Sequence, residues 1–199
     1  MIYLRNVCKE LPQNPYSFSF NKNQKKILTN INLTIEKGQI IALLGKNGSG
    51  KTSLIKILSG LLTPDSGDNN LNKISNLNIA TVNSNDKSFF LRLSIYDNLK
   101  YFTSLSGHSQ NYKSIDQALE LVDLQNKANA FFGTLSSGEK KRLSIARALI
   151  KKPKLLLLDE FTTSLDIISR KKILKTIKNI YSENKIESII FATHSLDEV

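Results

Sequence analysis

The amino-acid sequence predicts an α/β fold in which a mostly parallel β-sheet is flanked by helices. Short apolar runs at 40–44, 155–158 and 188–192 have the length and composition of buried strands. Stretches between these runs, such as 173–181, carry apolar residues at helical spacing instead. Strands that alternate with helices are typical of a parallel sheet, so both observations favour this class.

Composition restricts the possible classes of protein. The chain has 199 residues and 40% hydrophobic content, which suits one well-cored domain. Its longest apolar runs are too short to span a bilayer, and Met1–Arg5 does not open a signal peptide. Cys8 is the single cysteine, so no internal disulfide can form, in keeping with a reducing cytosol.

The net charge of +11 would suit a partner such as nucleic acid or an anionic membrane. The lysines are spread evenly along the chain, however, which favours a solvated surface, and we expect no nucleic-acid partner.

The N-terminal part of the chain is predicted to contain an antiparallel β part. Residues 1–7 and 31–35 are expected to form strands, the second with alternating apolar and polar residues. The polar segment 11–26 between them is predicted to be a loop. Residues 36–38 then turn the chain into a buried strand at 40–44.

The rest of the chain continues the alternation and adds a helical insertion after residue 94. The expected elements are a helix at 53–58, a turn at 62–67, a polar segment at 68–78, a strand at 77–82, helices at 95–105 and 115–122 with a loop at 107–113, a helix from 136 that ends before Pro153, a strand at 154–158, a turn at 162–166, a helix at 173–181 and a strand at 188–192.

The motif G-x-x-x-x-G-K-T occupies Gly45–Thr52, between a predicted strand and a predicted helix. Its glycines let backbone N–H groups converge on a polyphosphate, and the following helix adds the positive end of its dipole. Lys51 is expected to reach the β and γ phosphates, and the hydroxyl of Thr52 to ligate Mg²⁺. The motif therefore predicts a P-loop NTPase core. Nucleotide contacts are expected from Gly45, Asn47, Gly48, Ser49, Gly50, Lys51, Thr52 and Ser53.

Polar residues follow two of the other predicted strands. Asp159 and Glu160 come directly after the strand at 154–158. In P-loop NTPases an aspartate there holds Mg²⁺, and a second carboxylate can orient and deprotonate the attacking water. His194 follows the strand at 188–192; contact with the γ phosphate is the interpretation we favour over a surface histidine with no such role.

Aromatic residues in the loop at 11–26 have two interpretations. One ring could stack on adenine, or the rings could pin the loop to the core, and the sequence does not choose among Tyr16, Phe18 and Phe20.

Taken together, these motifs resemble the ATP-binding cassette (ABC) family, the nucleotide-binding subunits of ABC transporters. The resemblance covers nearly the whole chain and keeps the family's order. The matching segments are Walker A at Gly45–Thr52, the signature at Leu135–Glu139, Walker B at Leu155–Asp159, the catalytic glutamate at Glu160, the D-loop at Ser164–Asp166 and the switch histidine at His194.

The chain departs from the family pattern at several positions. The signature reads L-S-S-G-E in place of L-S-G-G-Q, although Ser136 and Gly138 are kept. Counting back without gaps from 93–99, Asn85 takes the place of a glutamine that touches Mg²⁺ and water; counting forward from the preceding strand would give Ser84.

Two further departures lie near the catalytic glutamate and the end of the chain. Phe161 replaces the usual proline. The chain stops at Val199, soon after the histidine, so we expect the strands and helix that commonly close a cassette to be missing.

The resemblance implies a site shared by two cassettes that pack head to tail with twofold symmetry. Thr52, Asp159 and Asn85 would hold Mg²⁺, while Glu160 acts as general base and His194 senses the γ phosphate. The signature of the second cassette would complete each site through Ser136, Ser137, Gly138 and Glu139, with Asp166 in the adjoining D-loop.

The function implied is that of an ATP-hydrolysing subunit that powers an ABC transporter through ATP-driven dimerisation. ATP and Mg²⁺ would be its cofactors. A second cassette, expected to be an identical copy, and transmembrane permease subunits would be its partners. Such a subunit would be cytoplasmic and peripheral on the cytoplasmic face of the membrane. Residues 86–93 resemble cassettes of polysaccharide or drug exporters, which favours export.

One alternative function stays open in the sequence. A soluble ABC-type ATPase that acts on ribosomes, nucleic acid or cofactor assembly is the alternative class. Within a single domain at 1–199, we expect a RecA-like core at 1–85 and 146–199 and a helical subdomain at about 86–145.

Overall fold

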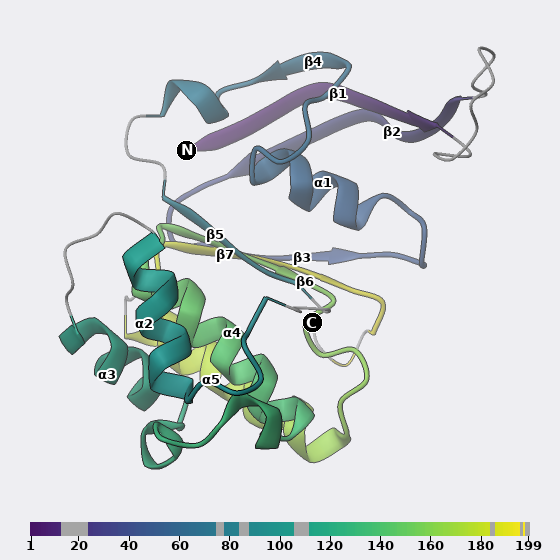
Figure 1. Cartoon of the computed structure of the whole chain (residues 1–199). Helices are drawn as coiled ribbons and strands as arrows, with labels where there is room; N and C mark the ends of the chain where they lie inside the picture. The colour runs from purple at the N-terminus through teal and green to yellow at the C-terminus, as the bar shows by residue number, and fades with distance from the viewer. Residues whose placement is uncertain are drawn as a thin grey trace.

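Two β-sheets lie on either side of helix α1 (Lys51–Leu58), and the other α-helices cover the far face of the second sheet (Figure 1). The computed structural model describes residues 1–12, 24–74, 78–83, 88–105, 112–183, 186–195 and 197. Tyr16, Phe18 and Phe20, which were considered for adenine stacking, lie outside the described residues.

The first sheet is antiparallel, with strand order β2-β1-β4. β1 (Ile2–Pro12) pairs with β2 (Gln24–Ile35) from Ile2 opposite Ile35 to Pro12 opposite Gln24. Both strands are longer than predicted, and the expected loop at 11–26 was wrong at both ends. Antiparallel pairing satisfies backbone groups whatever the side chains, so the polar residues at 24–26 did not prevent strand formation there.

The strand β4 (Ser66–Asn69) was missed, because its residues suggested a turn and a polar segment. It pairs with β1 through Leu4 opposite Asn69 and Arg5 opposite Asp68. Gly67 has φ +97°, and a Cβ there would lie 2.6 Å from the Cα of Val7. Only glycine can adopt this conformation so close to the neighbouring strand.

The second sheet is parallel, with order β3-β7-β6-β5. Its strands are β3 (Ile40–Leu44), β5 (Ile79–Asn83), β6 (Leu155–Asp159) and β7 (Ser188–Thr193). β6 and β7 are buried throughout, as their apolar composition predicted. The prediction of a buried β3 was wrong: Ile40 is 46% and Leu44 49% exposed. Among the described strands β3 pairs with β7 alone, which places it at the edge of the sheet.

The helices divide between two hydrophobic cores. α1 fills the smaller core between the sheets, through Leu54, Ile55, Ile57 and Leu58. The larger core lies on the other face of the parallel sheet. It is built with α2 (Ile95–Leu105), α3 (Tyr112–Leu121), α4 (Ser137–Ile150) and α5 (Ile167–Ser182), joined by short 3₁₀ helices at Gln125–Lys127 and Phe132–Thr134, while a further one, Leu71–Lys73, follows β4.

Two observations bear on the expected organisation. α4 runs without interruption from 137 to 150, across the boundary placed at 145/146, and the division into core and helical subdomain stays a prediction. No helix within the described ranges combines the length and the apolar character needed to cross a bilayer.

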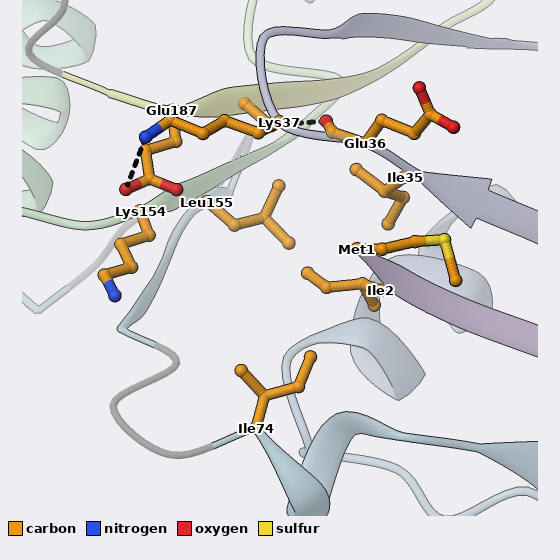
Figure 2. A pocket seen from close by; sticks show the side chains of 10 residues that line it. Met1, Ile2, Ile35, Glu36, Lys37, Ile74, Lys154, Leu155 and Glu187 are labelled. Carbon is orange, nitrogen blue, oxygen red and sulfur yellow. Dashed lines mark hydrogen bonds and ion pairs between the residues drawn. The ribbon is translucent and has the colours of Figure 1, made fainter.

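A pocket of about 130 Å³ opens at the amino ends of β6 and β7 (Figure 2). Ile2, Ile35, Ile74 and Leu155 form its apolar lining, and the ion pair between Lys37 and Glu187 (3.6 Å) closes one side. Because it lies at the amino ends of these strands, the pocket is remote from the polar residues that follow their carboxyl ends.

The close approach at Gly67 makes a stability prediction. Gly67→Ala is expected to lower the free energy of unfolding by about 3 kcal/mol, since the left-handed backbone is strained and β1 must also shift. Gly60→Ala is the matched control, because Gly60 has φ +75° but open space around its Cβ position, and should cost only about 1 kcal/mol. Urea unfolding of both variants measures the difference; equal losses would contradict the role assigned to the β1–β4 contact.

Candidate nucleotide-binding site

The carboxyl ends of the parallel strands bring the predicted polar residues to one edge of the sheet. Leu44 of β3 is opposite Thr193 of β7, and Asp159 of β6 is opposite Ala192. The phosphate loop, His194 and the Asp159–Glu160 pair therefore begin side by side, although they are far apart in the sequence. In open α/β sheets ligands bind outside this edge.

The phosphate loop depends on glycine at three positions. Gly48 has φ +79°, and Gly50, the N-cap of α1, has φ +96°. A Cβ at Gly50 would lie 2.8 Å from the carbonyl oxygen of Ile27, and one at Gly45 would lie 2.7 Å from Oγ of Ser49. Gly50 therefore lets the loop pack closely against β2, Gly45 leaves room for Ser49, and glycines in such a loop allow backbone N–H groups to converge on an anion.

Lys51 lies across this loop. Its ammonium donates to the carbonyl oxygens of Gly45 (2.7 Å) and Lys46 (3.0 Å), and Nζ is 3.6 Å from Oε1 of Glu160. The side chain is buried, so its charge depends on these oxygens. A polyphosphate in the loop would offer the ammonium stronger anionic partners than carbonyl groups do.

Thr52 and Asp159 supply two oxygen ligands to one point. Oγ1 of Thr52 donates to Oδ1 of Asp159 at 3.1 Å, across 107 positions of sequence. Burial raises the pKa of Asp159, and the negative charge of Glu160 adds to this, whereas the hydrogen bond from Thr52 opposes it. A hydroxyl and a carboxylate side by side are the hard oxygen donors that Mg²⁺ takes, so these residues fit the metal.

Glu160 is held at a sharp turn after β6. It has φ +46°, and its N–H donates to the carbonyl oxygen of Ala192 at 3.1 Å. A left-handed conformation at a residue other than glycine is strained and is retained only where the surroundings enforce it. Phe161, which stands where the family has proline, is 1% exposed and belongs to the larger core. The buried ring anchors the turn that carries Glu160.

The remaining predicted site residues are located mainly by the elements that precede them. His194 is exposed, directly after β7, and Asn47 is exposed at the tip of the phosphate loop. β5 ends at Asn83, opposite Asp159, so the segment that follows it starts at the same edge. Asn85 and Ser84 themselves lie outside the described residues, so the position of the expected glutamine substitute stays a prediction.

The signature residues start helix α4. Ser136 is its N-cap, and a capping box joins the Ser136 and Glu139 side chains to each other's backbone N–H groups. A Cβ at Gly138 would lie 3.0 Å from Oγ of Ser169 on α5. Asp166 caps α5 by accepting from the N–H (2.9 Å) and the hydroxyl (2.7 Å) of Ser169. The structure thus joins the signature to the predicted D-loop through Ser169, a contact that the sequence did not suggest.

The signature and the phosphate loop belong to different parts of the fold. α1 packs against β2, β6 and β7, whereas α4 packs against α2, α3, α5 and β5, on the other face of the parallel sheet (Figure 1). Ser136 and Ser137 are exposed, and Gly138 is covered by α5.

This fold and this site define a P-loop nucleotide-binding protein. Comparison with known proteins narrows the class. A family model described as "ABC transporter" matches residues 28–163. The energy-coupling factor transporter ATP-binding protein EcfA1 of Streptococcus pyogenes is 35% identical in an alignment 195 residues long, and the match covers 92% of this chain and 70% of that protein. The chain belongs to the ABC transporter family and is an ATP-binding, ATP-hydrolysing subunit of that family.

Solved structures agree with the fold. cbiO1 from Clostridium perfringens, part of the ABC transporter complex cbiONQ, superposes with a TM-score of 0.80 at 27% identity, over all of this chain and 80% of that one. An ATP-binding cassette captured as a dimer after hydrolysis, with ADP and Pi bound, superposes with a TM-score of 0.78 at 24% identity, over all of this chain and 90% of that one.

The environment of Asp159 makes a prediction about pH. Because its pKa is raised on folding, the stability that its protonated form contributes is present below the unfolded pKa and is lost as pH rises through the folded pKa. Asp159→Asn stays neutral, so without metal it should be more stable than the wild type above that pKa, on the order of 1 kcal/mol.

Urea unfolding in EDTA from about pH 4 to about pH 8 checks this difference. Asp65→Asn is a control of opposite sign. The hydrogen bond from Lys9 lowers the pKa of Asp65, so its contribution is present above the unfolded pKa and is lost as pH falls through the folded one. A stability curve of Asp159→Asn that runs parallel to the wild type at every pH would contradict the raised pKa.

Proposed function

We propose that this chain hydrolyses ATP in a site shared by two copies and so drives a transporter of the energy-coupling factor type. The observation that carries the proposal is the assembly of Lys51, Thr52, Asp159 and Glu160 at one edge of the parallel sheet. Similarity to EcfA1 and to cbiO1 supports the transporter type.

In this proposal each residue of the site has a defined task. The loop N–H groups and Lys51 bind the β and γ phosphates, and Thr52 and Asp159 hold Mg²⁺, which when bound neutralises charge on the phosphates. Glu160 takes a proton from the water that attacks the γ phosphorus in line, while the bond to the β,γ-bridging oxygen breaks and ADP leaves with that oxygen. His194 contacts the γ phosphate. If the Lys51 ammonium bound a phosphate and no longer paired with Glu160, the carboxylate of Glu160 would be available as a base.

In this proposal the second copy supplies the signature residues, which in a single copy lie away from its own phosphate loop. Ser136, Ser137 and Gly138 begin α4, on the sheet face opposite α1. In a head-to-tail pair related by a twofold axis, the start of α4 in one copy would face the phosphate loop of the other, and both sites would form together. Ser136 and the first N–H groups of α4 would then contact the γ phosphate.

The type of transporter proposed differs from the one that residues 86–93 favoured. That segment suggested export, whereas 35% identity to EcfA1 across 92% of this chain supports an energy-coupling factor transporter, and hence uptake. The nucleotide site is common to both directions, so the comparison along the whole chain outweighs a short segment.

An exposed apolar patch on the helical side is the proposed contact with a transmembrane permease. The rings of Phe90 and Tyr101 meet edge to face at 4.9 Å, and the N–H of Gly133 donates to the carbonyl oxygen of Leu91 at 3.0 Å. Apolar surface gathered in this way marks protein contacts. Its members are Phe90 (45% exposed), Leu91 (63%), Leu93 (38%), Tyr101 (42%) and Phe131 (56%). Through this contact the chain would be held at the cytoplasmic face of the membrane.

Loss of the Glu160 carboxylate tests the catalytic assignment. Glu160→Gln keeps the size of the side chain but removes the base, and it is expected to lower turnover on the order of 10²–10⁴-fold while ATP still binds. Phosphate release and nucleotide titration measure the two effects. Glu187→Gln, at the opposite end of β7, is the matched control and should retain activity. Near-normal hydrolysis by Glu160→Gln would refute the assignment.

The proposed docking role of the apolar patch predicts that the chain binds a membrane protein. The tagged chain, purified in mild detergent from its own cells, should bring a polytopic membrane protein with it, and Leu91→Glu should reduce the recovery at least about tenfold. Leu61→Glu is the control, because Leu61 is similarly exposed (71%) but follows α1. Both variants should still bind ATP when isolated.

Other outcomes of the same purification are equally informative. Equal recovery with Leu91→Glu and the wild type would exclude the patch as the docking site. Recovery of ribosomes, nucleic acid or soluble assembly factors in place of a membrane protein would favour the soluble class of ABC ATPase.

A further inference from the structure

Glu139 places a carboxylate at the start of α4, in the position where the family signature has glutamine. Its Oε2 accepts from the N–H of Ser136 at 2.9 Å, and its own N–H donates to Oγ of Ser136 at 3.3 Å. This arrangement stabilises the helix start. It also adds a negative charge to the helix end that is proposed to receive a phosphate.

Lys127 binds the other oxygen of this carboxylate. Its Nζ lies 2.6 Å from Oε1 of Glu139, across twelve positions of sequence, from the 3₁₀ helix Gln125–Lys127. The Glu139 side chain is 17% exposed and that of Lys127 is 51% exposed. Both carboxylate oxygens therefore have donors, and Lys127 is the more exposed member of the pair.

The pair is ionic at neutral pH. The hydrogen bond from Lys127, followed by the N–H of Ser136, lowers the pKa of Glu139, so its carboxylate is charged. Arg142, one turn further along α4, binds the carbonyl oxygens of Val122 (2.7 Å) and Asp123 (2.9 Å). Its charge thus serves the loop after α3, whereas the ammonium of Lys127 lies at the signature itself.

Two anions that approach the same helix N-terminus repel each other, and the repulsion is strong where water is excluded. A phosphate that meets Ser136 and Gly138 would come close to the Glu139 carboxylate. A family member with a neutral glutamine avoids this repulsion, whereas this chain needs a compensating cation.

We propose that Lys127 is a positioning residue for the signature: it neutralises Glu139 and holds it in the capping box, so that the nucleotide bound by a second copy can approach. The inference rests on the proposed shared site. It assigns to a residue outside the signature a part in binding the polyphosphate of the partner's nucleotide.

The test is a double-mutant cycle on ATP-dependent dimerisation. In a Glu160→Gln background, which keeps ATP bound, the ATP concentration for half-maximal dimer is measured by sedimentation. Lys127→Met should raise this concentration about 3- to 10-fold when residue 139 is glutamate, and less than about twofold when it is glutamine. Salt should reduce the effect between about 0.05 M and about 1 M, because it screens the uncompensated charge.

A control and two contrary results complete the experiment. Lys37→Met removes a comparable surface partner of Glu187 at the opposite end of the sheet (Figure 2) and should not change dimerisation. Equal, salt-independent losses from Lys127→Met in both backgrounds would show a structural role and overturn the inference while the shared site stands. Absence of ATP-dependent dimer even with Lys127 and Glu139 intact would overturn the shared site and this inference together.

Discussion

Parallel pairing of β3, β7, β6 and β5 is the constraint on which the rest of the site depends. The register places Asp159 opposite Ala192 and Leu44 opposite Thr193, which brings loops from distant parts of the sequence to one edge. Side chains alternate between the faces of a strand, so a slip of one residue in β6 would turn Asp159 to the other face and away from Thr52. It would also break the hydrogen bond that fixes Glu160 to Ala192. Buried apolar side chains on both faces of β6 and β7 maintain the register, and the core thereby determines the chemistry.

Charged side chains of opposite sign lie close together at this edge of the sheet. Lys51 and Asp159 are both buried, and the partly exposed carboxylate of Glu160 lies 3.6 Å from the Lys51 ammonium. Buried charges are tolerated only when they are paired, so each depends on partners that a nucleotide would replace. The raised pKa of Asp159 reflects the same situation, because burial and the negative charge of Glu160 outweigh the hydrogen bond from Thr52 and the positive charges of Lys56 and Lys51. Binding of a polyphosphate with its metal would replace these partners with stronger ones, because Mg²⁺ would add positive charge beside Asp159 and the phosphates would add negative charge beside Lys51.

The sequence predicted local features well and long-range ones poorly, for physical reasons. The phosphate loop is contiguous in the chain, so its glycines, Lys51 and Thr52 could be recognised directly. β6 and β7 could be predicted because strands buried on both faces are apolar throughout. The exposure of β3 depends on which strands pair with it, and β4 forms through backbone contacts to β1, so neither could be derived from its own residues. Lys127 is one of many surface lysines until the fold brings it to Glu139. Transport direction is not encoded in the nucleotide site, so the motifs recognised there could not decide between export and uptake.

The close contact between Gly138 and Ser169 has a mechanical consequence. A methyl group at position 138 would press against Oγ of Ser169, and Ser169 in turn binds both carboxylate oxygens of Asp166. The beginnings of α4 and α5 are therefore in contact, and close-packed groups transmit displacement instead of absorbing it. A displacement of either helix start would therefore press on the other, so the packing at Gly138 couples the positions of the signature and the predicted D-loop.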